Sequence, residues 1–247
     1  MNEKPVKRPL SRIKAVLFDL DGTLSDNSAG ITGCIEYALT EMGLPAPAKE
    51  QLYWCIGPPL RSTFAKLLAL NSADLAAGTA GDLIKLSAEL PPAGSELVEE
   101  AIRLYRLRYG EWGWSQNILY PGIPALFSAL CASGRTLAVT TTKTKVFAER
   151  IVDHFGLAGQ LAAVYGPDAA GRLSSKSELI SAALEAHGFK PETTAIVGDR
   201  DLDILGGKSH SLATVGVSYG FGSINELQEA GADYIVGSVI ELIDLFE

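Results

Sequence analysis

Short apolar runs alternate with amphipathic stretches along much of the chain. The run Ala15–Phe18 is wholly apolar, as expected of a strand that is buried on both faces. After residue 120, the pattern predicts strands over 136–141, 161–165, 194–197, 212–217 and 234–236. Helical spacing lies between and after them, over 121–132, 144–155, 174–187, 224–230 and 239–246, with a short helix around residue 204. Strands that alternate with helices predict an α/β fold with a doubly wound parallel sheet.

The block between residues 29 and 114 has a different pattern, without strand-like alternation. Helical spacing of apolar residues extends over 29–42 and ends at Gly43. Further amphipathic stretches cover 60–70, 82–90 and 95–109, the last with Ser95 as a suitable N-cap. We therefore expect a helical domain over 28–115, inserted into a core domain formed by 1–27 and 116–247. The first dozen residues are expected to fray.

Composition limits the possible partners. The chain has 247 residues, of which 47% are hydrophobic and 20% charged, and its net charge is −8. An acidic chain without a basic patch argues against nucleic acid binding. No apolar run is long enough for a membrane span, and no apolar segment follows the basic residues near the start. Three scattered cysteines are typical of reduced thiols. We expect a cytoplasmic monomer or homodimer without a membrane or nucleic acid partner.

Two carboxylates follow the first predicted strand. Asp19 and Asp21 come directly after it, and Gly22 allows the backbone to turn. Ligands of open α/β sheets bind at the carboxyl ends of the strands, and two nearby carboxylates favour a cation. The sequence therefore suggests an acidic metal site. An ordinary Asp-Gly turn is the simpler alternative. A calcium loop fails on spacing, because Gly22 in its sixth position would make Leu17 the first ligand.

Three more polar clusters lie near predicted strand ends or helix starts. They are Thr140-Thr141-Thr142-Lys143, a lysine at a predicted helix start (Lys176), and Gly198-Asp199-Arg200-Asp201-Leu202-Asp203. Backbone N–H groups at a strand-to-helix turn can hold a phosphate, and a group of carboxylates beside substrate phosphate suits Mg²⁺. Each cluster also has an ordinary interpretation: a threonine-rich strand end, a solvated lysine, and a capped helix start.

Taken in order, the four clusters resemble the haloacid dehalogenase superfamily of aspartate-nucleophile hydrolases, and within it the phosphoglycolate phosphatase-like branch. The likeness extends from about residue 13 to residue 247. Three further stretches are similar to that branch: Ile56-Gly57-Pro58-Pro59-Leu60, Tyr120-Pro121-Gly122-Ile123, and Val217-Ser218-Tyr219-Gly220-Phe221-Gly222. The second cluster departs from the branch, which often has Asn or Ser after its Thr, then Lys-Pro. The resemblance implies a core that does the chemistry and an inserted cap that closes over it.

The resemblance also implies roles for the carboxylates. Asp19 would be the nucleophile that forms an aspartyl-phosphate, and Asp21 the general acid and base. Mg²⁺ would be held by Asp19, the backbone carbonyl of Asp21, and Asp199, with support from Asp203. The family's dehalogenases carry an aromatic residue in place of Asp21, so its presence favours phosphate chemistry.

Phosphate-binding roles are implied in the same way. Thr141 would bind the phosphoryl oxygens with the backbone of Thr142 nearby, and Lys176 would neutralise charge between nucleophile and phosphate. Consecutive threonines leave Thr140 as the alternative to Thr141, which we favour because Lys143 then has the family spacing.

In the cap, three residues that could face the substrate are Gly57, Pro58 and Arg61. A helix N-terminus with an exposed arginine explains them equally well.

We therefore expect a Mg²⁺-dependent phosphatase acting on a small phosphorylated metabolite, with phosphoglycolate as the first candidate and nucleoside monophosphates, as for a 5′-nucleotidase, next. A β-phosphoglucomutase-type phosphomutase would share all four core motifs. A non-catalytic binding protein on the same fold is the third hypothesis, and the presence of both Asp19 and Asp21 weighs against it.

Overall fold

The computed structural model describes residues 10–69, 94–168, 170 and 172–247. The chain divides into two compact units, one formed by residues 1–26 and 119–247 and the other by residues 27–118. The predicted cap, residues 28–115, lies within the second unit. The helix expected over 82–90 falls outside the described residues.

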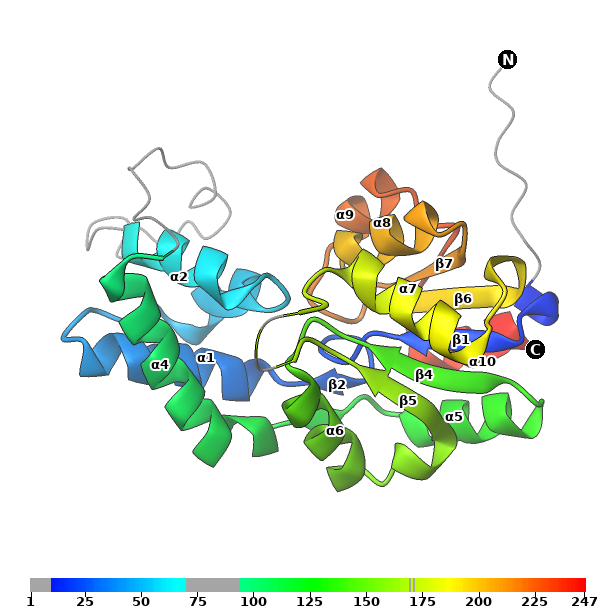
Figure 1. Cartoon of the computed structure of the whole chain (residues 1–247), viewed down its shortest axis with the longest axis horizontal. Coiled ribbons are helices and arrows are strands. Elements are labelled where there is room, and N and C mark those ends of the chain that lie inside the picture. The colour runs from blue at the N-terminus through cyan, green and yellow to red at the C-terminus, as the bar shows by residue number, and fades with distance from the viewer. Residues whose placement is uncertain (1–9, 70–93, 169, 171) are drawn as a thin grey trace, which may run out of the picture. The chain divides into compact units, whose positions relative to one another are not determined.

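A parallel sheet forms the centre of the first unit (Figure 1). Its strand order is β5-β4-β1-β6-β7-β8, with bounds β1 Ala15–Phe18, β4 Thr136–Thr140, β5 Leu161–Tyr165, β6 Thr194–Gly198, β7 Ala213–Val217 and β8 Tyr234–Val236. Strand β1 pairs in parallel with both β4 and β6, so that Phe18 lies opposite Val139 on one side and Val197 on the other. The predicted doubly wound sheet is confirmed, with each predicted strand correct to within one residue at either end.

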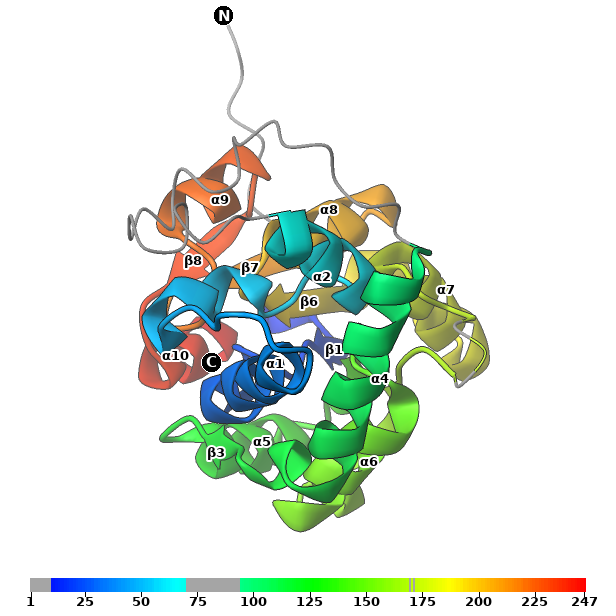
Figure 2. The same ribbon diagram turned by 90° about the vertical axis from the view of Figure 1, so that its left-hand side faces the viewer.

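Helices cover both faces of this sheet (Figures 1 and 2). On one face lie α7 (Lys176–His187), α8 (Asp201–Ser209) and α9 (Ile224–Glu229). On the other lie α5 (Ile123–Ala132), α6 (Lys145–His154) and α10 (Val239–Phe246). Short 3-10 helices complete the unit: η1 Leu10–Arg12, η5 Ala158–Gln160 and η6 Pro191–Thr193. The expected frayed start is wrong for residues 10–12, because Leu10 is buried and anchors η1.

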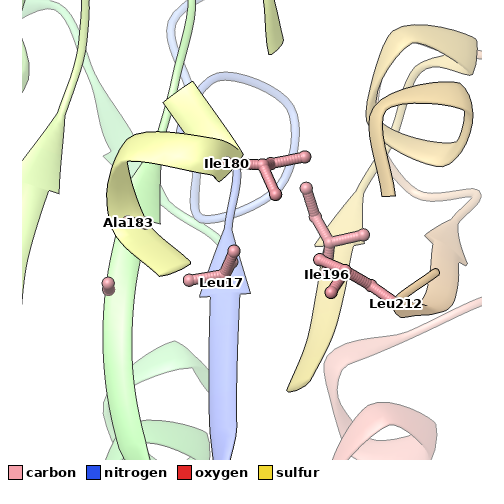
Figure 3. Close-up of a cluster of buried hydrophobic side chains, with 6 residues drawn as sticks. Leu17, Ile180, Ala183, Ile196 and Leu212 are labelled. Carbon is pink, nitrogen blue, oxygen red and sulfur yellow. The ribbon is translucent and has the colours of Figure 1, made fainter. Parts of the chain in front are cut away.

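The core beneath α7 shows why this helix has a fixed position. Small and branched apolar side chains of the helix pack against strands β1, β4 and β6 and the residue before β7. Figure 3 shows this cluster with Leu17, Ile180, Ala183, Ile196 and Leu212 labelled, and Ala138 of β4 also belongs to it. All of them are at least 96% buried. Burial of such side chains contributes about 1.5–3 kcal/mol for each large one. The packing therefore fixes the N-terminus of α7 relative to the ends of the three strands.

The second unit is helical in its described part. It contains α1 (Ser28–Glu41), η2 (Lys49–Cys55), α2 (Leu60–Ala69), α4 (Glu96–Glu111) and η4 (Gly113–Ser115). Helix α4 contacts both α1 and α2. The Ser95 hydroxyl caps α4, as predicted, by accepting a hydrogen bond from the Val98 N–H. The sequence patterns missed η2 and the two-residue strands β2 (Ser25–Asp26) and β3 (Ile118–Leu119), which pair with each other.

Two expectations about the whole chain can be compared with the structure. Among the residues that the structure describes, no helix has both the length and the apolar character of a membrane span. The cysteines Cys34, Cys55 and Cys131 form no disulfide with one another.

Candidate active site

The predicted polar clusters meet at one edge of the sheet. Asp19 directly follows β1, Thr141 follows β4 and Asp199 follows β6, and these three strands are parallel neighbours. Their following residues therefore share the carboxyl edge of the sheet, which is where open α/β sheets bind ligands. All three residues are buried, with exposed fractions of 7%, 1% and 0%. A buried polar edge of this kind is stable only if its charges are balanced.

The turn after β1 folds back tightly on the end of β6. The Gly22 N–H donates to the Ser25 carbonyl at 2.8 Å, and the N–H groups of Leu24 and Ser25 donate to the Leu20 carbonyl. Gly22 has a φ of +84°, and a Cβ at this position would overlap the carboxylate of Asp199. Only glycine satisfies both conditions without strain. Asp21 and Gly22 thus form a turn, and the glycine allows this turn to pack directly against the carboxylate of Asp199.

Three carboxylates form the centre of the site. Oxygen atoms of Asp19, Asp199 and Asp203 lie within 4.8 Å of one another, and all three residues are buried. Carboxylate oxygens are the ligands that hard divalent cations prefer. In addition, Gly22 and Gly220 bring the backbone against Asp199, where a Cβ at either position would overlap its side chain. The donor set and its close backbone therefore fit a bound divalent cation.

Lys176 is the counter-charge within this cluster. Its Nζ lies 3.0 Å from Asp19 Oδ1 and 2.7 Å from Asp203 Oδ1, and it donates to the Thr140 carbonyl at 2.7 Å. The two carboxylates are therefore ion-pair partners of the ammonium group, which also donates one hydrogen bond to the backbone. Lys176 is the first residue of α7, which begins with a capping box between Ser175 and Glu178. The cap and the packed helix thus hold the lysine against the nucleophile candidate.

The carboxylates strongly perturb one another's protonation. Burial raises the pKa of Asp199 to about 8, and the negative charges of Asp19 and Asp203 add to the effect. Burial likewise raises the pKa of Asp203 to about 6, against the opposing attraction of Lys176. For Lys176, burial favours the neutral form, but the charges of Asp19 and Asp203 outweigh it and raise the pKa above its ordinary value. The site therefore has an excess of negative charge.

Asp21 lies in a different environment from the three clustered carboxylates. Its Oδ2 atom forms an ion pair with Lys143 Nζ at 2.8 Å, and the two side chains are only 13% and 7% exposed. The sequence analysis used Lys143 to set the spacing of a motif and missed this contact. Its position at the turn after β4 was the available signal, because that turn borders the same edge of the sheet as Asp21.

The three threonines before Lys143 are distinguished by the structure. Thr140 is the last residue of β4, and its carbonyl accepts a hydrogen bond from Lys176 Nζ. Thr141 is the first residue beyond the strand, where its N–H donates to the Tyr165 carbonyl at 2.9 Å and its hydroxyl accepts from the Lys143 N–H at 3.2 Å. The choice of Thr141 as the phosphate ligand stays a prediction, as does the role of the Thr142 backbone.

The loop after β7 supplies further contacts that the sequence analysis did not assign. The Phe221 N–H donates to Asp199 Oδ2 at 2.8 Å, while the Thr23 hydroxyl donates to Asp199 Oδ1 at 3.2 Å. The Tyr219 hydroxyl in turn donates to the Thr23 carbonyl at 3.1 Å. Both oxygen atoms of Asp199 are therefore oriented by hydrogen bonds. The stretch 217–222 resembled the family in sequence, but only the fold shows what it contacts.

The candidate substrate residues of the cap, Gly57, Pro58 and Arg61, all lie in the second unit. Gly57 has a φ of +102° and precedes helix α2. The guanidinium of Arg61 binds both carboxylate oxygens of Glu99, at 2.7 and 3.1 Å. This exposed pair shows what Arg61 contacts within its own unit. A role for the three residues in substrate binding stays a prediction.

Comparison with known proteins supports the interpretation of the core. Residues 16–217 match the model of the haloacid dehalogenase-like hydrolase family. A 5′-nucleotidase from Pseudomonas aeruginosa is 36% identical over 88% of this chain and 88% of its own length. The tyrosine-protein kinase PtkA from Mycobacterium tuberculosis is 34% identical over 84% of this chain and 62% of its own.

Two further relatives cover most of both chains. A phosphoglycolate phosphatase from Vibrio parahaemolyticus is 27% identical over 94% of this chain and 96% of its own. The crystal structure of a predicted phosphatase from Clostridium acetobutylicum is 35% identical, with a TM-score of 0.80 over 94% of this chain and 97% of that one. The chain belongs to the haloacid dehalogenase-like hydrolases, as a phosphatase of that family.

Proposed function

We propose that this protein is a Mg²⁺-dependent phosphatase that hydrolyses a phosphomonoester of a small metabolite through an aspartyl-phosphate on Asp19. The observation that carries the proposal is the charge balance at the sheet edge. Three buried carboxylates (Asp19, Asp199 and Asp203) meet one lysine (Lys176), which leaves two formal negative charges. One divalent cation balances them, and carboxylates with substrate phosphate are the usual Mg²⁺ environment.

In this proposal the metal is held by the side chains of Asp19 and Asp199 and by the backbone carbonyl of Asp21. Asp203 supports the site by holding Lys176 beside Asp19. The bound cation supplies neutralisation of charge on the phosphoryl oxygens, which is the main requirement of phosphoryl transfer. Hydrogen bonds from the Thr23 hydroxyl and the Phe221 N–H orient Asp199 for this role.

The reaction takes two steps. A carboxylate oxygen of Asp19 attacks phosphorus, the bond from phosphorus to the ester oxygen breaks, and that oxygen takes a proton from Asp21. A water molecule then attacks the aspartyl-phosphate, its proton passes to the Asp21 carboxylate, and the bond from phosphorus to Asp19 breaks. Inorganic phosphate leaves and both aspartates return to their starting forms.

The remaining residues bind and orient the phosphoryl group. Lys176 neutralises charge between Asp19 and the phosphoryl group and holds the Asp19 side chain in place, because its ammonium lies 3.0 Å from Oδ1. The Thr141 hydroxyl and the Thr142 backbone lie at the end of β4, beside the strand that carries Asp19, and are proposed to bind the phosphoryl oxygens. Gly57, Pro58 and Arg61 of the second unit are proposed to contact the rest of the substrate.

The substrate class is proposed from the relatives. A 36% identical relative is a 5′-nucleotidase, and 27% identical relatives are phosphoglycolate phosphatases. Nucleoside 5′-monophosphates and phosphoglycolate are therefore the two substrates to compare first. A phosphomutase would be distinguished by retention of the phosphoryl group on an added sugar phosphate.

Phosphate release from an aryl phosphate tests the class. Mg²⁺ should support turnover, and a chelator should abolish it. Asp19→Asn should lower kcat by about 10⁴-fold or more, since the nucleophile is lost. Asp153→Asn on α6 is the matched control, because Asp153 is exposed and far along the helix from the turn after β4. A panel of nucleotides, phosphoglycolate and sugar phosphates follows. Wild-type protein without turnover on every ester, or Asp19→Asn with normal turnover, would contradict the proposal.

A further inference from the structure

The two lysines of the site have separate partners. Lys176 contacts Asp19 and Asp203, which belong to the group of clustered carboxylates, while Lys143 forms its ion pair with Asp21. Among the described residues, Asp21 is not a member of the group of acidic side chains close enough to share a metal ion. Lys176 thus forms ion pairs with two of the clustered carboxylates, and Lys143 forms one with the remaining carboxylate, Asp21.

We propose that Lys143 is a positioning residue that reserves Asp21 for proton transfer to and from the reacting oxygens. This role rests on the proposed function, in which Asp21 serves as acid and then as base. Without the lysine, the Asp21 carboxylate would be free to rotate toward the cation beside Asp19, two residues away. The contact at 2.8 Å holds one oxygen, Oδ2, which can accept from the ammonium group whether the carboxyl group is ionised or carries its proton on Oδ1, and so fixes the orientation of the whole group.

The backbone around Lys143 is rigid enough for this task. The Thr141 N–H donates to the Tyr165 carbonyl and the Lys145 N–H donates to the Pro167 carbonyl, both at 2.9 Å. These bonds fasten the turn on both sides of Lys143 to the last residue of β5 and to the chain just after it. In addition, a Cβ at Gly166 would overlap the Lys143 carbonyl oxygen, so the two segments are in direct contact. The Lys143 side chain therefore extends from a turn whose backbone is held in place.

The position of Asp21 is also fixed from its own side. Asp21 forms a backbone bridge with Ser25, and the Gly22 N–H donates to the Ser25 carbonyl at 2.8 Å. Lys143 adds a contact to the Asp21 side chain itself, at Oδ2. A pair that is 7% and 13% exposed is screened by solvent much less than a surface pair. Loss of Lys143 should therefore act through Asp21 and on the proton-transfer steps.

The leaving group provides the test. Nitrophenyl phosphate has a good leaving group and needs little proton donation, whereas glycerol 2-phosphate has an alkoxide leaving group that requires it. Lys143→Met should lower kcat by about 30-fold or more for the alkyl ester but about threefold or less for the aryl ester. Lys143→Arg should recover most of the alkyl rate, because it retains the positive charge. Lys145→Met is the matched control, because the Lys145 side chain is half exposed and its ion pair with Glu149 is long, at 3.7 Å.

A double-mutant cycle with Asp21→Asn completes the test. In the Asp21→Asn background, Lys143→Met should change the alkyl rate by less than about twofold, because the residue through which it acts has been removed. Additive losses, equal losses for the two esters, or a higher KM with unchanged kcat would overturn the proposal and show that Lys143 binds the substrate itself. A thermal melt identifies a misfolded variant, in which case Lys143→Gln replaces it. Wild-type protein without phosphate release would instead refute the proposed function, and this role with it.

Discussion

The polar residues of the two units are held in different ways. In the first unit, Asp19, Lys176 and Asp203 are at least 93% buried and contact one another directly. In the second, Arg61 and Glu99 form an ion pair whose side chains are 59% and 41% exposed. Buried charges require partners, while exposed charges lose little when they are separated. The buried charges of the first unit therefore indicate the type of reaction, whereas the exposed charges of the second unit do not indicate which substrate is bound.

Removal of the buried Lys176 side chain should cause the largest loss of stability among the substitutions that compare buried with exposed charges. Lys176→Met leaves Asp19 and Asp203 buried without their counter-charge, and breaking such a pair costs about 3–5 kcal/mol. The free energy of unfolding, measured by urea titration without metal, should fall accordingly. Lys145→Met is the surface control and should change it by less than about 1 kcal/mol. Equal effects of the two substitutions would show that burial does not separate these lysines.

The pH dependence of stability should reveal the uncompensated carboxylate. Asp199 has its ordinary pKa of 3.8 when unfolded but about 8 when buried beside Asp19 and Asp203. The folded state therefore holds this proton more tightly, so its contribution stabilises the metal-free protein at low pH and is lost as pH rises from about 4 to about 8.

Two comparisons isolate this contribution. Unfolding free energies of metal-free protein, measured from pH 5 to pH 8, should decline less steeply for Asp199→Asn than for wild type. Mg²⁺ should restore more stability to the wild type at pH 8 than at pH 5. Identical slopes for the two proteins would argue that the raised pKa of Asp199 does not affect folding.

Two glycines with positive φ give a smaller and sharper contrast. A Cβ at Gly22 (φ +84°) would overlap the Asp199 carboxylate, whereas a Cβ at Gly43 (φ +70°) would meet nothing within 4 Å. Both alanine variants bear a backbone cost of about 1 kcal/mol, but Gly22→Ala must also displace a proposed metal ligand. Mg²⁺ affinity, measured by calorimetry, should fall about tenfold or more for Gly22→Ala. For Gly43→Ala, the Mg²⁺ affinity should stay within about twofold of wild type. A loss as large as that of Gly22→Ala would show that displacement of Asp199 by the added Cβ is not the cause.

The exposed pair of the second unit should show the smallest effect on stability. Arg61→Met removes the Glu99 contact, and because both side chains are exposed and screened by solvent, the free energy of unfolding should stay close to that of wild type. If Arg61 binds substrate, KM for the preferred ester should rise while the rate with a small aryl phosphate stays unchanged. Arg103→Met, which breaks a similar exposed pair with Glu100, is the matched control. Unchanged KM for every ester would exclude Arg61 from substrate binding.

Much of the fold could be predicted because its local signals agree. The apolar run of β1 and the helical spacing over 174–187 both specify their elements within a few residues. The frayed start was predicted wrongly for residues 10–12, since the burial of Leu10 depends on distant segments of the chain. The short strands β2 and β3 were missed for the same reason, because two residues carry no periodicity.

By itself, the sequence determined the α/β class and the edge at which the carboxylates of Asp19, Asp21 and Asp199 gather, because strand ends and turns are local features. The family resemblance placed Lys176 beside the nucleophile, but only the tertiary structure decided which carboxylates Lys176 and Lys143 contact. Lys176 contacts Asp19 across 157 positions of sequence and Lys143 contacts Asp21 across 122, and no local pattern carries such pairings. They follow from the strand order, which places β4 and β6 on either side of β1, and from the packing of α7 over all three strands.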